Sequence, residues 1–470
     1  MGGGSRSALQ LSRRDLLRSG LLAAGALAGG GVLGSCGSSP PTVLEGAGRY
    51  RWPVPVARRK PGSLPFPDRP PGTDTMPEIE HVVVLMMENH SYDNYLGMLG
   101  RGDGFSLGPD GMPTNWNPTT DGRRQLAFPM TNDCQQDGKP SQEWADCHAQ
   151  FAGGTNAGFV GSPSGPVAMG YWDRAQLPFY YSLASTFPLA DRWFCSLLGQ
   201  TFPNRRFLTA ATSAGMVNDV LSQAIDKPPN GTIMDRLDQH KVSWRNYFHT
   251  AGLPTIDVWF DDHAAHEGKV VAIDQFFSDA AAGTLPGVSI VDPDFGTQSE
   301  EDPQNIAMGQ RFASQVVSAV MQGPGWPKTL LVWTYDEHGG YYDHVPPPPA
   351  LAPDDIAPLS PVKPNGPEKA YDGFRRYGFR VPAAVVSPFA RKDHVTHVIH
   401  DHTSILAMVE RKWNLPALTY RDANAADLMD FLDLSTPAFM EPPTLAAPLS
   451  VGADCSPGQA GALPPVGSVR

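Results

Sequence analysis

Two apolar runs in the sequence end abruptly in acidic and amide side chains. The segment Glu78–Met87, which we predict to be the first strand, is followed by Glu88 and Asn89, and the mainly apolar segment 330–335 is followed by Asp336 and Glu337. Continuous apolar runs of this length are typical of strands buried on both faces of a sheet. Ligands bind at the carboxyl ends of such strands in open α/β sheets, so we expect the two polar pairs to share one site.

Further apolar patterns alternate between helical and strand-like character along the chain. This alternation predicts an α/β fold, a three-layer sandwich around a mostly parallel sheet. The predicted helices are Ser91–Leu99, Pro178–Ala184, Thr232–Gln239, Asn305–Met321 and His402–Arg411, and the other predicted strands are Pro188–Asp191, Val242–Tyr247, Val288–Val291 and Val381–Val386.

The first 35 residues resemble an export signal. Arg13 and Arg14 precede a Gly/Ala-rich apolar run that is short for a membrane span, the pattern of twin-arginine export. An ordinary Sec signal peptide is the alternative, because it also tolerates two arginines. The stretch ending in Cys36 resembles a lipoprotein processing box, the alternative being an incidental cysteine. We expect an exported protein of the cell envelope, lipid-anchored or secreted.

The rest of the chain divides by composition. Residues 36–77 are rich in Pro, Gly and Ser and predict an extended tether, residues 78–449 the folded domain, and residues 450–470 a tail. Within the domain, residues 101–170 are polar and Gly-rich. We interpret them as an irregular excursion that folds over the site and not as a second domain.

Composition limits the classes of function. The chain has 36 basic and 48 acidic residues and a formal net charge of −12, which argues against a nucleic-acid partner. A phosphorylated substrate is still compatible, because a bound metal dominates the field of its own site. Four cysteines follow Cys36, an even number that fits two disulfides in an exported protein. Short separation favours Cys134–Cys147 among the possible pairs.

The candidate site residues offer hard oxygen ligands. Such ligands favour Ca, Mg or Mn, with Zn as a further possibility. The residues are Glu88, Asn89, Thr201, Asp336 and Glu337. Thr201 stands at a predicted helix N-cap, where a metal-bound hydroxyl would be a nucleophile. The plainer alternatives are a capping threonine, and acids that face solvent or pair with arginines.

Histidines near these stretches are candidates for proton transfer to a leaving group. The acids beside His338 and His344 favour a catalytic role for these two histidines, although either one alone would more often be structural. Asp401 and His402 begin a predicted helix, and we interpret them as its cap and as a support for the site.

The stretches that carry these residues resemble the bacterial phosphoesterase family of the alkaline-phosphatase-like superfamily, which contains non-haemolytic-type phospholipases C and a group of acid phosphatases. The resemblance implies that Thr201 is the nucleophile, through a phosphothreonine intermediate, and that His148 is an active-site histidine. Many members carry His-Pro where this chain has Asp302-Pro303. The matching stretches are Glu80–Asp93, Gln200–Arg205, Tyr335–Pro347 and Asp401–Ser404.

The resemblance implies a phospholipase C that releases diacylglycerol and a phosphorylated head group, with phospholipid and a membrane surface as partners. An acid phosphatase acting on small phosphomonoesters is the first alternative. A surface-binding lipoprotein without turnover is the second, supported only by Asp302. The lipase interpretation needs an apolar approach to the site. Candidates for it are the aromatic residues Phe202, Trp172, Tyr341 and Tyr342, although such residues are more often part of the core.

Overall fold

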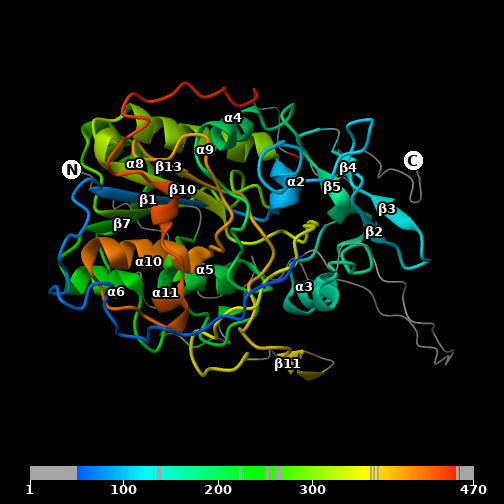
Figure 1. The fold of residues 1–470 in the computed structure, drawn as a ribbon, viewed down its shortest axis with the longest axis horizontal. Helices are drawn as coiled ribbons and strands as arrows, with labels where there is room; N and C mark the ends of the chain where they lie inside the picture. Colours follow the sequence, from blue (N-terminus) through cyan, green and yellow to red (C-terminus); the bar gives the residue numbers. More distant parts are fainter. Residues whose placement is uncertain are drawn as a thin grey trace, which may run out of the picture. The chain divides into compact units, whose positions relative to one another are not determined.

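The computed structural model describes most of the chain after residue 49 (Figure 1). The predicted export signal, Cys36 and the first part of the predicted tether lie outside the described residues, as does nearly all of the predicted tail. The described residues are 50–130, 132–134, 139–221, 225, 227–249, 253–259, 266–359, 362–363, 366–367, 370–450 and 455.

A mixed sheet of eight strands forms the centre of the described domain. Five neighbouring strands, from β10 to β8, are parallel, and β13 is the antiparallel exception between β10 and β6. The mostly parallel sheet predicted from the sequence is confirmed. In spatial order the strands are β14 (Val395–Thr396), β6 (Leu189–Ala190), β13 (Ala383–Val386), β10 (Thr329–Tyr335), β1 (His81–Met87), β9 (Val288–Val291), β7 (Trp244–Phe248) and β8 (Val270–Ala272).

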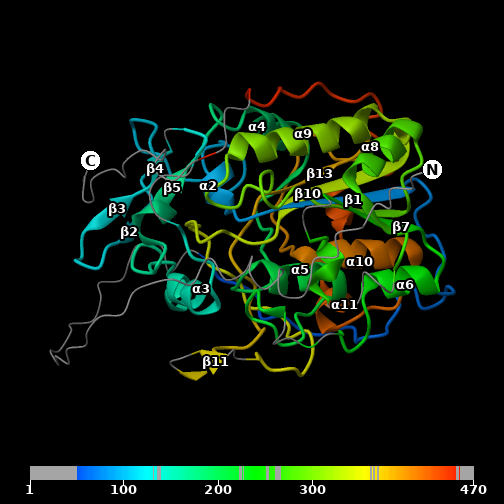
Figure 2. The same cartoon turned by 180° about the vertical axis from the view of Figure 1, so that it is seen from behind.

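Helices cover both faces of this sheet, which completes the three-layer sandwich (Figures 1 and 2). One face carries α4 (Pro178–Thr186), α8 (Ile273–Ala282) and α9 (Ile306–Gln322). The other carries α5 (Thr201–Ala210), α6 (Ile233–Gln239), α10 (His402–Trp413) and α11 (Tyr420–Asn424). With helices on both sides, every residue of β10 and all but the first of β1 are buried, which explains their unbroken apolar sequence.

Local sequence signals set where the helices begin. Asn305 caps α9 by accepting a hydrogen bond from the Ala307 N–H, and Asp401 caps α10 in a capping box with Ser404. Helix α5 begins one residue earlier than its cap signal suggests. Gln200 occupies the N-cap, so Thr201 is the first residue of the helix and not its cap.

Residues 101–170 form short elements beside the carboxyl ends of the central strands, next to α2 (Tyr92–Leu96) (Figure 1). The described residues of this stretch contain no large sheet, which agrees with an excursion from the main domain. The elements are β2 (Trp116–Pro118), β3 (Arg124–Leu126), β4 (Phe128–Pro129), α3 (Trp144–Phe151) and the 3-10 turns Ala152–Gly154 and Gly165–Met169, and β4 pairs with β5 (Gly170–Tyr171).

Residues 50–77, here called the arm, contain no helix or strand. The arm contains several turns after residue 58, and it is attached to the domain along its length. The Gly62 N–H donates to the Ala417 carbonyl at 2.8 Å, and the Asn414 side chain bonds the backbone of Phe66 and Arg69. Helix α10 and the segment after it therefore hold the arm in place.

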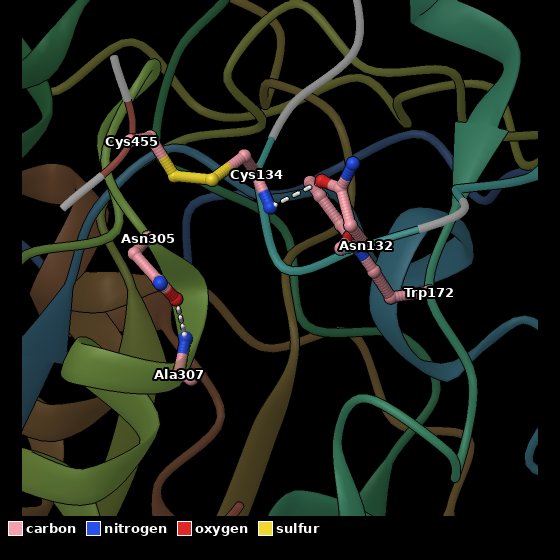
Figure 3. The surroundings of a disulfide bond; sticks show 6 residues. All are labelled: Asn132, Cys134, Trp172, Asn305, Ala307 and Cys455. Carbon is pink, nitrogen blue, oxygen red and sulfur yellow. Dashed lines mark hydrogen bonds between the residues drawn. A yellow bond between two sulfur atoms is a disulfide. The ribbon is translucent and has the colours of Figure 1, made fainter. Parts of the chain in front are cut away.

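The predicted Cys134–Cys147 disulfide is wrong. Cys134 is bonded to Cys455, with Cα atoms 5.7 Å apart, while Cys147 is a buried thiol (Figure 3). Cys134 lies in a loop where Trp172 donates to the Asn132 carbonyl, close to the start of α9. Cys147 lies inside α3 and directs its sulfur to the Gln142 carbonyl. A short separation along the chain therefore did not bring the two thiols together.

Removing this disulfide is expected to lower the free energy of unfolding. Its two cysteines are 321 residues apart, and closing so long a loop restricts the unfolded chain. The usual gain is about 2–5 kcal/mol. The double variant Cys134→Ser/Cys455→Ser should unfold at lower urea concentration than the wild type. Reductant should lower the midpoint of the wild type and leave that of the variant unchanged, whereas equal sensitivity of both would contradict the prediction.

A buried carboxyl lies in the aromatic core next to α9. Glu300 accepts hydrogen bonds from the phenols of Tyr95, Tyr180 and Tyr335 at 2.6–2.9 Å. Even so, burial raises its pKa from the usual 4.5 to about 8. Gly309 of α9 is required here, because a Cβ at that position would lie 2.1 Å from the Glu300 Cγ.

This carboxyl should make stability depend on pH. Its contribution is complete below pH 4.5, where both folded and unfolded states are protonated, and is lost as pH rises towards 8. The slope is at most about 1.4 kcal/mol per pH unit. Urea unfolding of wild type and Glu300→Gln at pH 5 and pH 8 tests this. The stability of the wild type relative to the variant should fall between the two pH values, and a constant difference would refute it.

Candidate active site

Three parallel strands deliver carboxylates to one edge of the sheet. The register pairs Met87 of β1 with Tyr335 of β10, so Glu88 and Asp336 follow at the same level. On the other side of β1, Leu85 pairs with Val291 of β9, which places Asp292 next to them. All three carboxylates are buried. The expectation that the two apolar strands end side by side is therefore confirmed.

Arg205 of α5 connects these carboxylates. Its Nε donates to Asp336 Oδ2 at 3.1 Å, while its two Nη atoms lie 3.6 Å from Glu88 Oε1 and 3.8 Å from Asp292 Oδ1. The guanidinium is almost completely buried. Burial alone would lower the pKa of Arg205, but the three carboxylates raise it, led by Asp336, so this residue is a fixed positive charge.

One arginine does not balance the acids around it. Burial raises the pKa of Glu88 and Glu337 well above the usual range, and the nearby Asp336 charge raises both further. Burial raises the pKa of Asp336 as well. Buried carboxylates with raised pKa values favour the uptake of protons or of another cation.

Two side-chain oxygens at these strand ends have no hydrogen-bond partner among the described residues, although both are buried. They are Asn89 Oδ1 and Glu337 Oε1. The segments after the two strands approach each other closely at Gly339. A Cβ at this position would lie 1.9 Å from the Asn89 carbonyl oxygen, so only glycine fits there. Unpartnered amide and carboxylate oxygens are the donors that a hard divalent cation takes. The residues present therefore fit a divalent metal.

Helix α5 carries Thr201 one turn before Arg205. Thr201 and Arg205 are four residues apart, so they lie on the same face of the helix. The next residue, Phe202, donates its backbone N–H to Asp219 Oδ1 at 2.8 Å. Burial raises the pKa of Asp219 to about 7, and the charge of Asp336 contributes to the rise. Thr201 is 8% exposed and is therefore mostly buried.

His338 is held within the site but is neutral. Its Nε2 donates to Gln150 Oε1 at 2.7 Å, and its Nδ1 lies 3.1 Å from Glu337 Oε2. Burial lowers the pKa of His338 to about 3. A histidine in this state contacts the metal-candidate residue Glu337 but holds no extra proton at neutral pH.

His344 belongs to a neighbouring ionic cluster. It contacts Asp93 at 2.7 Å and Asp103 at 3.3 Å, and these acids raise its pKa to about 9 although burial acts to lower it. Ligand atoms of Asp93, Asp343 and His344 lie within 4.8 Å of one another, as at a metal site. Arg380 donates to Asp93 at 3.0 Å and to Asp343 at 2.9 Å, so this cluster already contains a cation.

His148 lies on α3 and faces the loop that follows the central strands. Its Nδ1 donates to the Trp144 carbonyl at 2.7 Å, its Nε2 lies 3.9 Å from Asp372 Oδ1, and its ring stacks on Tyr371. None of these contacts is with the strand-end carboxylates. The structure therefore gives His148, His338 and His344 three different surroundings.

Asp401 and His402 have the supporting roles expected of them. Asp401 caps α10, and His402 Nε2 donates to the backbone carbonyl of Asp336 at 2.7 Å. Asp302 is buried and accepts a hydrogen bond from the Tyr341 hydroxyl at 2.9 Å. Burial raises the pKa of Asp302 well above its usual range. This residue therefore supplies a carboxyl group where a histidine was expected from the family resemblance.

Comparison with known proteins identifies the family. Residues 79–416, more than half of the chain, match the phosphoesterase family. The chain belongs to that family. It is 29% identical over 463 residues to Phospholipase C A of Mycobacterium tuberculosis (strain ATCC 25618 / H37Rv), covering 87% of each protein. It is also 32% identical over 403 residues to Non-specific phospholipase C6 of Arabidopsis thaliana, covering 78% of this chain and 75% of that protein.

Among solved structures, the phosphoesterase is similar to a protein of the alkaline phosphatase superfamily from Vibrio parahaemolyticus. That match has a TM-score of 0.33 and 13% identity, and it covers 67% of this chain and 74% of the other. Family membership, together with the relatives named as phospholipases C, makes the chain a hydrolase that acts on phosphoric ester bonds.

Three of the four aromatic residues that were candidates for an apolar approach in this phosphoesterase are core residues. Trp172, Tyr341 and Tyr342 are buried in the main core, where Tyr341 stacks on His90, and Phe202 is half-buried. The alternative, that such aromatics belong to the core, is therefore confirmed for Trp172, Tyr341 and Tyr342, and Phe202 alone is partly exposed.

Sequence reasoning missed three charged residues of the phosphoesterase site. Asp292 could have been found, since it follows a predicted strand, as Glu88 and Asp336 do. Arg205 stands four residues after Thr201, a helical spacing that places both on one face. Asp219 gave no signal, because its contact with Phe202 depends on the path of the loop after α5.

Proposed function

We propose that this chain is a phospholipase C that cleaves glycerophospholipids on the glycerol side of phosphorus. The observation that carries the proposal is the helical spacing of Thr201 and Arg205 on α5, because Arg205 contacts the strand-end carboxylates Glu88 and Asp336. The relatives named as phospholipases C support the choice of substrate. The products would be diacylglycerol and a phosphorylated head group.

In the first half of the proposed reaction, the Thr201 hydroxyl oxygen attacks phosphorus. A bond forms between this oxygen and phosphorus, the bond from phosphorus to the glycerol oxygen breaks, and that oxygen takes up a proton as diacylglycerol leaves. In the second half, water attacks the phosphothreonine, the bond from phosphorus to Thr201 breaks, and the threonine oxygen regains a proton. No redox partner is required.

A divalent metal would be held by Glu88, Asn89, Asp336 and Glu337 with the Thr201 hydroxyl. When bound, it would lower the pKa of that hydroxyl and neutralise phosphate oxygens. The unpartnered Asn89 Oδ1 and Glu337 Oε1 and the raised pKa values of the carboxyls support this. The donors are all oxygen, so Ca, Mg or Mn is favoured.

The chain's own groups divide the remaining tasks. Arg205 holds a fixed positive charge beside the position where phosphate oxygens would gain negative charge. Asp219, with a pKa of about 7 and a contact one residue from Thr201, is a candidate to hold the proton that the leaving oxygen needs. The three histidines proposed from the sequence for proton transfer are still candidates, although none of the contacts described above joins them to Thr201. They are His148, His338 and His344.

The test is hydrolysis of phosphatidylcholine and p-nitrophenyl phosphate side by side, each with and without a chelator. Diacylglycerol release with little monoester turnover is expected, together with loss in chelator and recovery on adding a divalent metal. Monoester turnover alone would overturn the proposal in favour of a phosphatase. Full activity after exhaustive chelation would overturn the metal assignment.

We also propose that the protein is exported to the cell envelope through its twin-arginine-like signal and anchored by a lipid on Cys36. The Cys134–Cys455 disulfide supports an oxidising destination, because such bonds are rare in reducing compartments. Export that persists after Arg13→Lys with Arg14→Lys would contradict the twin-arginine route. Failure of Cys36 to incorporate radiolabelled palmitate would contradict the anchor.

A further inference from the structure

The arm presents apolar side chains to solvent next to unpaired cations. Val54 is 82% exposed and Val56 67% exposed, the two highest values among the large apolar residues that the structure describes. Arg58 and Lys60 follow directly and are also exposed, and no ion pair in the described part of the chain involves either. Adjacent exposed apolar side chains usually mark an interaction surface.

Hydrogen bonds to helix α11 fix this part of the arm in place. The Asn424 side chain of α11 accepts hydrogen bonds from the backbone N–H groups of Arg58 and Arg59 at 2.7 and 2.9 Å and donates to the Arg59 carbonyl at 2.8 Å. Pro53 and Pro55 lack N–H groups, so this stretch has fewer donors to satisfy. Together, α11 and the arm enclose a shallow hollow of about 420 Å³, lined by Val54, Val56, Arg58, Arg59, Ala423, Asn424 and Ala425.

The charge of this segment is opposite to that of the chain. Residues 46–67 contain five basic residues and no acidic one, whereas the chain as a whole carries −12. Of the nearest acids of the following segments, Glu410 and Asp422 are buried, and Asp427 pairs with Arg411 at 3.1 Å. Tyr420, one turn before Asn424 on α11, is 41% exposed and adds an aromatic ring of the kind found at lipid interfaces.

We propose that this surface, formed by Val54, Val56, Arg58 and Lys60, docks the enzyme on an anionic phospholipid membrane. The valines would enter the boundary between head groups and acyl chains, and the cations would contact lipid phosphates. The inference rests on the proposed function, since a phospholipase must work at its substrate's surface. Residue 50, where the arm begins, is 14 positions after Cys36, and this stretch spans at most about 50 Å, so an anchored chain keeps this surface close to the bilayer.

The start of the arm also contacts residues near the active site. At its start, Tyr50 donates to Asp103 at 2.7 Å and Trp52 donates to the Pro346 carbonyl at 3.1 Å. Asp103 contacts His344, seven residues after Glu337. The membrane-facing valines and the loop that follows the strand-end carboxylates are therefore connected by one short, attached segment.

The test uses the full chain with Cys36→Ser, so that no acyl anchor contributes. Binding to phosphatidylcholine vesicles with and without phosphatidylglycerol is measured by co-sedimentation, and hydrolysis of water-soluble p-nitrophenylphosphorylcholine is measured in parallel. Binding should be stronger with phosphatidylglycerol. Arg58→Glu/Lys60→Glu should weaken it by at least about twentyfold, from roughly fivefold per cation, and Val54→Glu/Val56→Glu by at least about tenfold.

Matched controls lie elsewhere on the surface. Met440→Glu changes a 45% exposed apolar residue, and Lys392→Glu reverses an exposed cation. Both controls should bind like the parent, and all variants should hydrolyse the soluble substrate at the parent rate. Unchanged binding in Val54→Glu/Val56→Glu would overturn the proposal. A loss confined to the charge-reversal variant would also overturn it, in favour of a polyanionic partner.

The same experiment separates this inference from the proposed function. One outcome is vesicle binding that follows the predicted pattern without hydrolysis of p-nitrophenylphosphorylcholine or of the vesicle lipid. This result would support docking and refute the phospholipase C assignment. If both arm variants still hydrolyse vesicle lipid at the parent rate, the phospholipase C assignment would be supported and the docking surface refuted.

Discussion

Replacing Thr201 by alanine is expected to lower phospholipid turnover by at least about a thousandfold, because it removes the oxygen that would attack phosphorus. The fold should persist, since Thr201 is the first residue of α5 and Gln200 occupies the N-cap. Turnover of phosphatidylcholine and the far-ultraviolet circular dichroism spectrum of the variant check both statements.

Thr201→Ser is the matched control, because it keeps a hydroxyl at the same backbone position. It should retain measurable turnover, and acid-quenched wild type should carry phosphate on the Thr201 peptide. Turnover of Thr201→Ala within tenfold of the wild type would refute the nucleophile assignment and return Thr201 to a structural role.

Replacing Arg205 by methionine is expected to destabilise the metal-free protein by about 3–5 kcal/mol, because it leaves buried carboxylates without their counter-charge. The side chain lies within 4 Å of Asp336, Glu88 and Asp292, and its Nη1 also donates to Thr255. Urea unfolding at pH 8 measures the loss. The loss should be smaller at pH 5, where protonation relieves the unpaired carboxylates.

Arg206→Met is the control for removing a buried arginine of the same helix that does not contact Glu88, Asp292 or Asp336. Arg206 is equally buried, donates to the Val258 and Ser213 carbonyls and lies over the Trp259 ring. Its replacement should also destabilise the protein, but without the relief at pH 5 that protonation of Glu88, Asp292 and Asp336 gives to Arg205→Met. A pH-independent loss in Arg205→Met would show that the strand-end carboxylates are not charged in the folded protein.

The central strands were predictable because their sequence is simple. Parallel strands covered by helices on both faces must be apolar throughout, so β1, β9 and β10 were visible as continuous runs, and the polar residues after them marked the site. Short edge strands such as β8, whose residues are only partly buried, gave no comparable pattern and were missed.

The long-range pairings were not predictable, for a different reason. Nothing in the sequence near Cys134 indicates that it pairs with Cys455. The two cysteines meet only because the folded domain brings its C-terminal residues to the loop that contains Cys134. The same holds for His344, whose partners Asp93 and Asp103 lie about 240 to 250 residues away. Helical spacing within α5 was a usable signal for Arg205, but only its contacts with three different strands show its role.

The disulfide between Cys134 and Cys455 closes a covalent ring that contains β1's partner strands, α5 and every helix from α4 to α11. A protease that cuts the backbone once inside this ring would not separate the fragments. The nicked enzyme should migrate as one band in a denaturing gel without reductant and as two bands with it. Loss of catalytic function in a nicked sample would therefore report local damage to the cut loop and not dissociation of the two pieces.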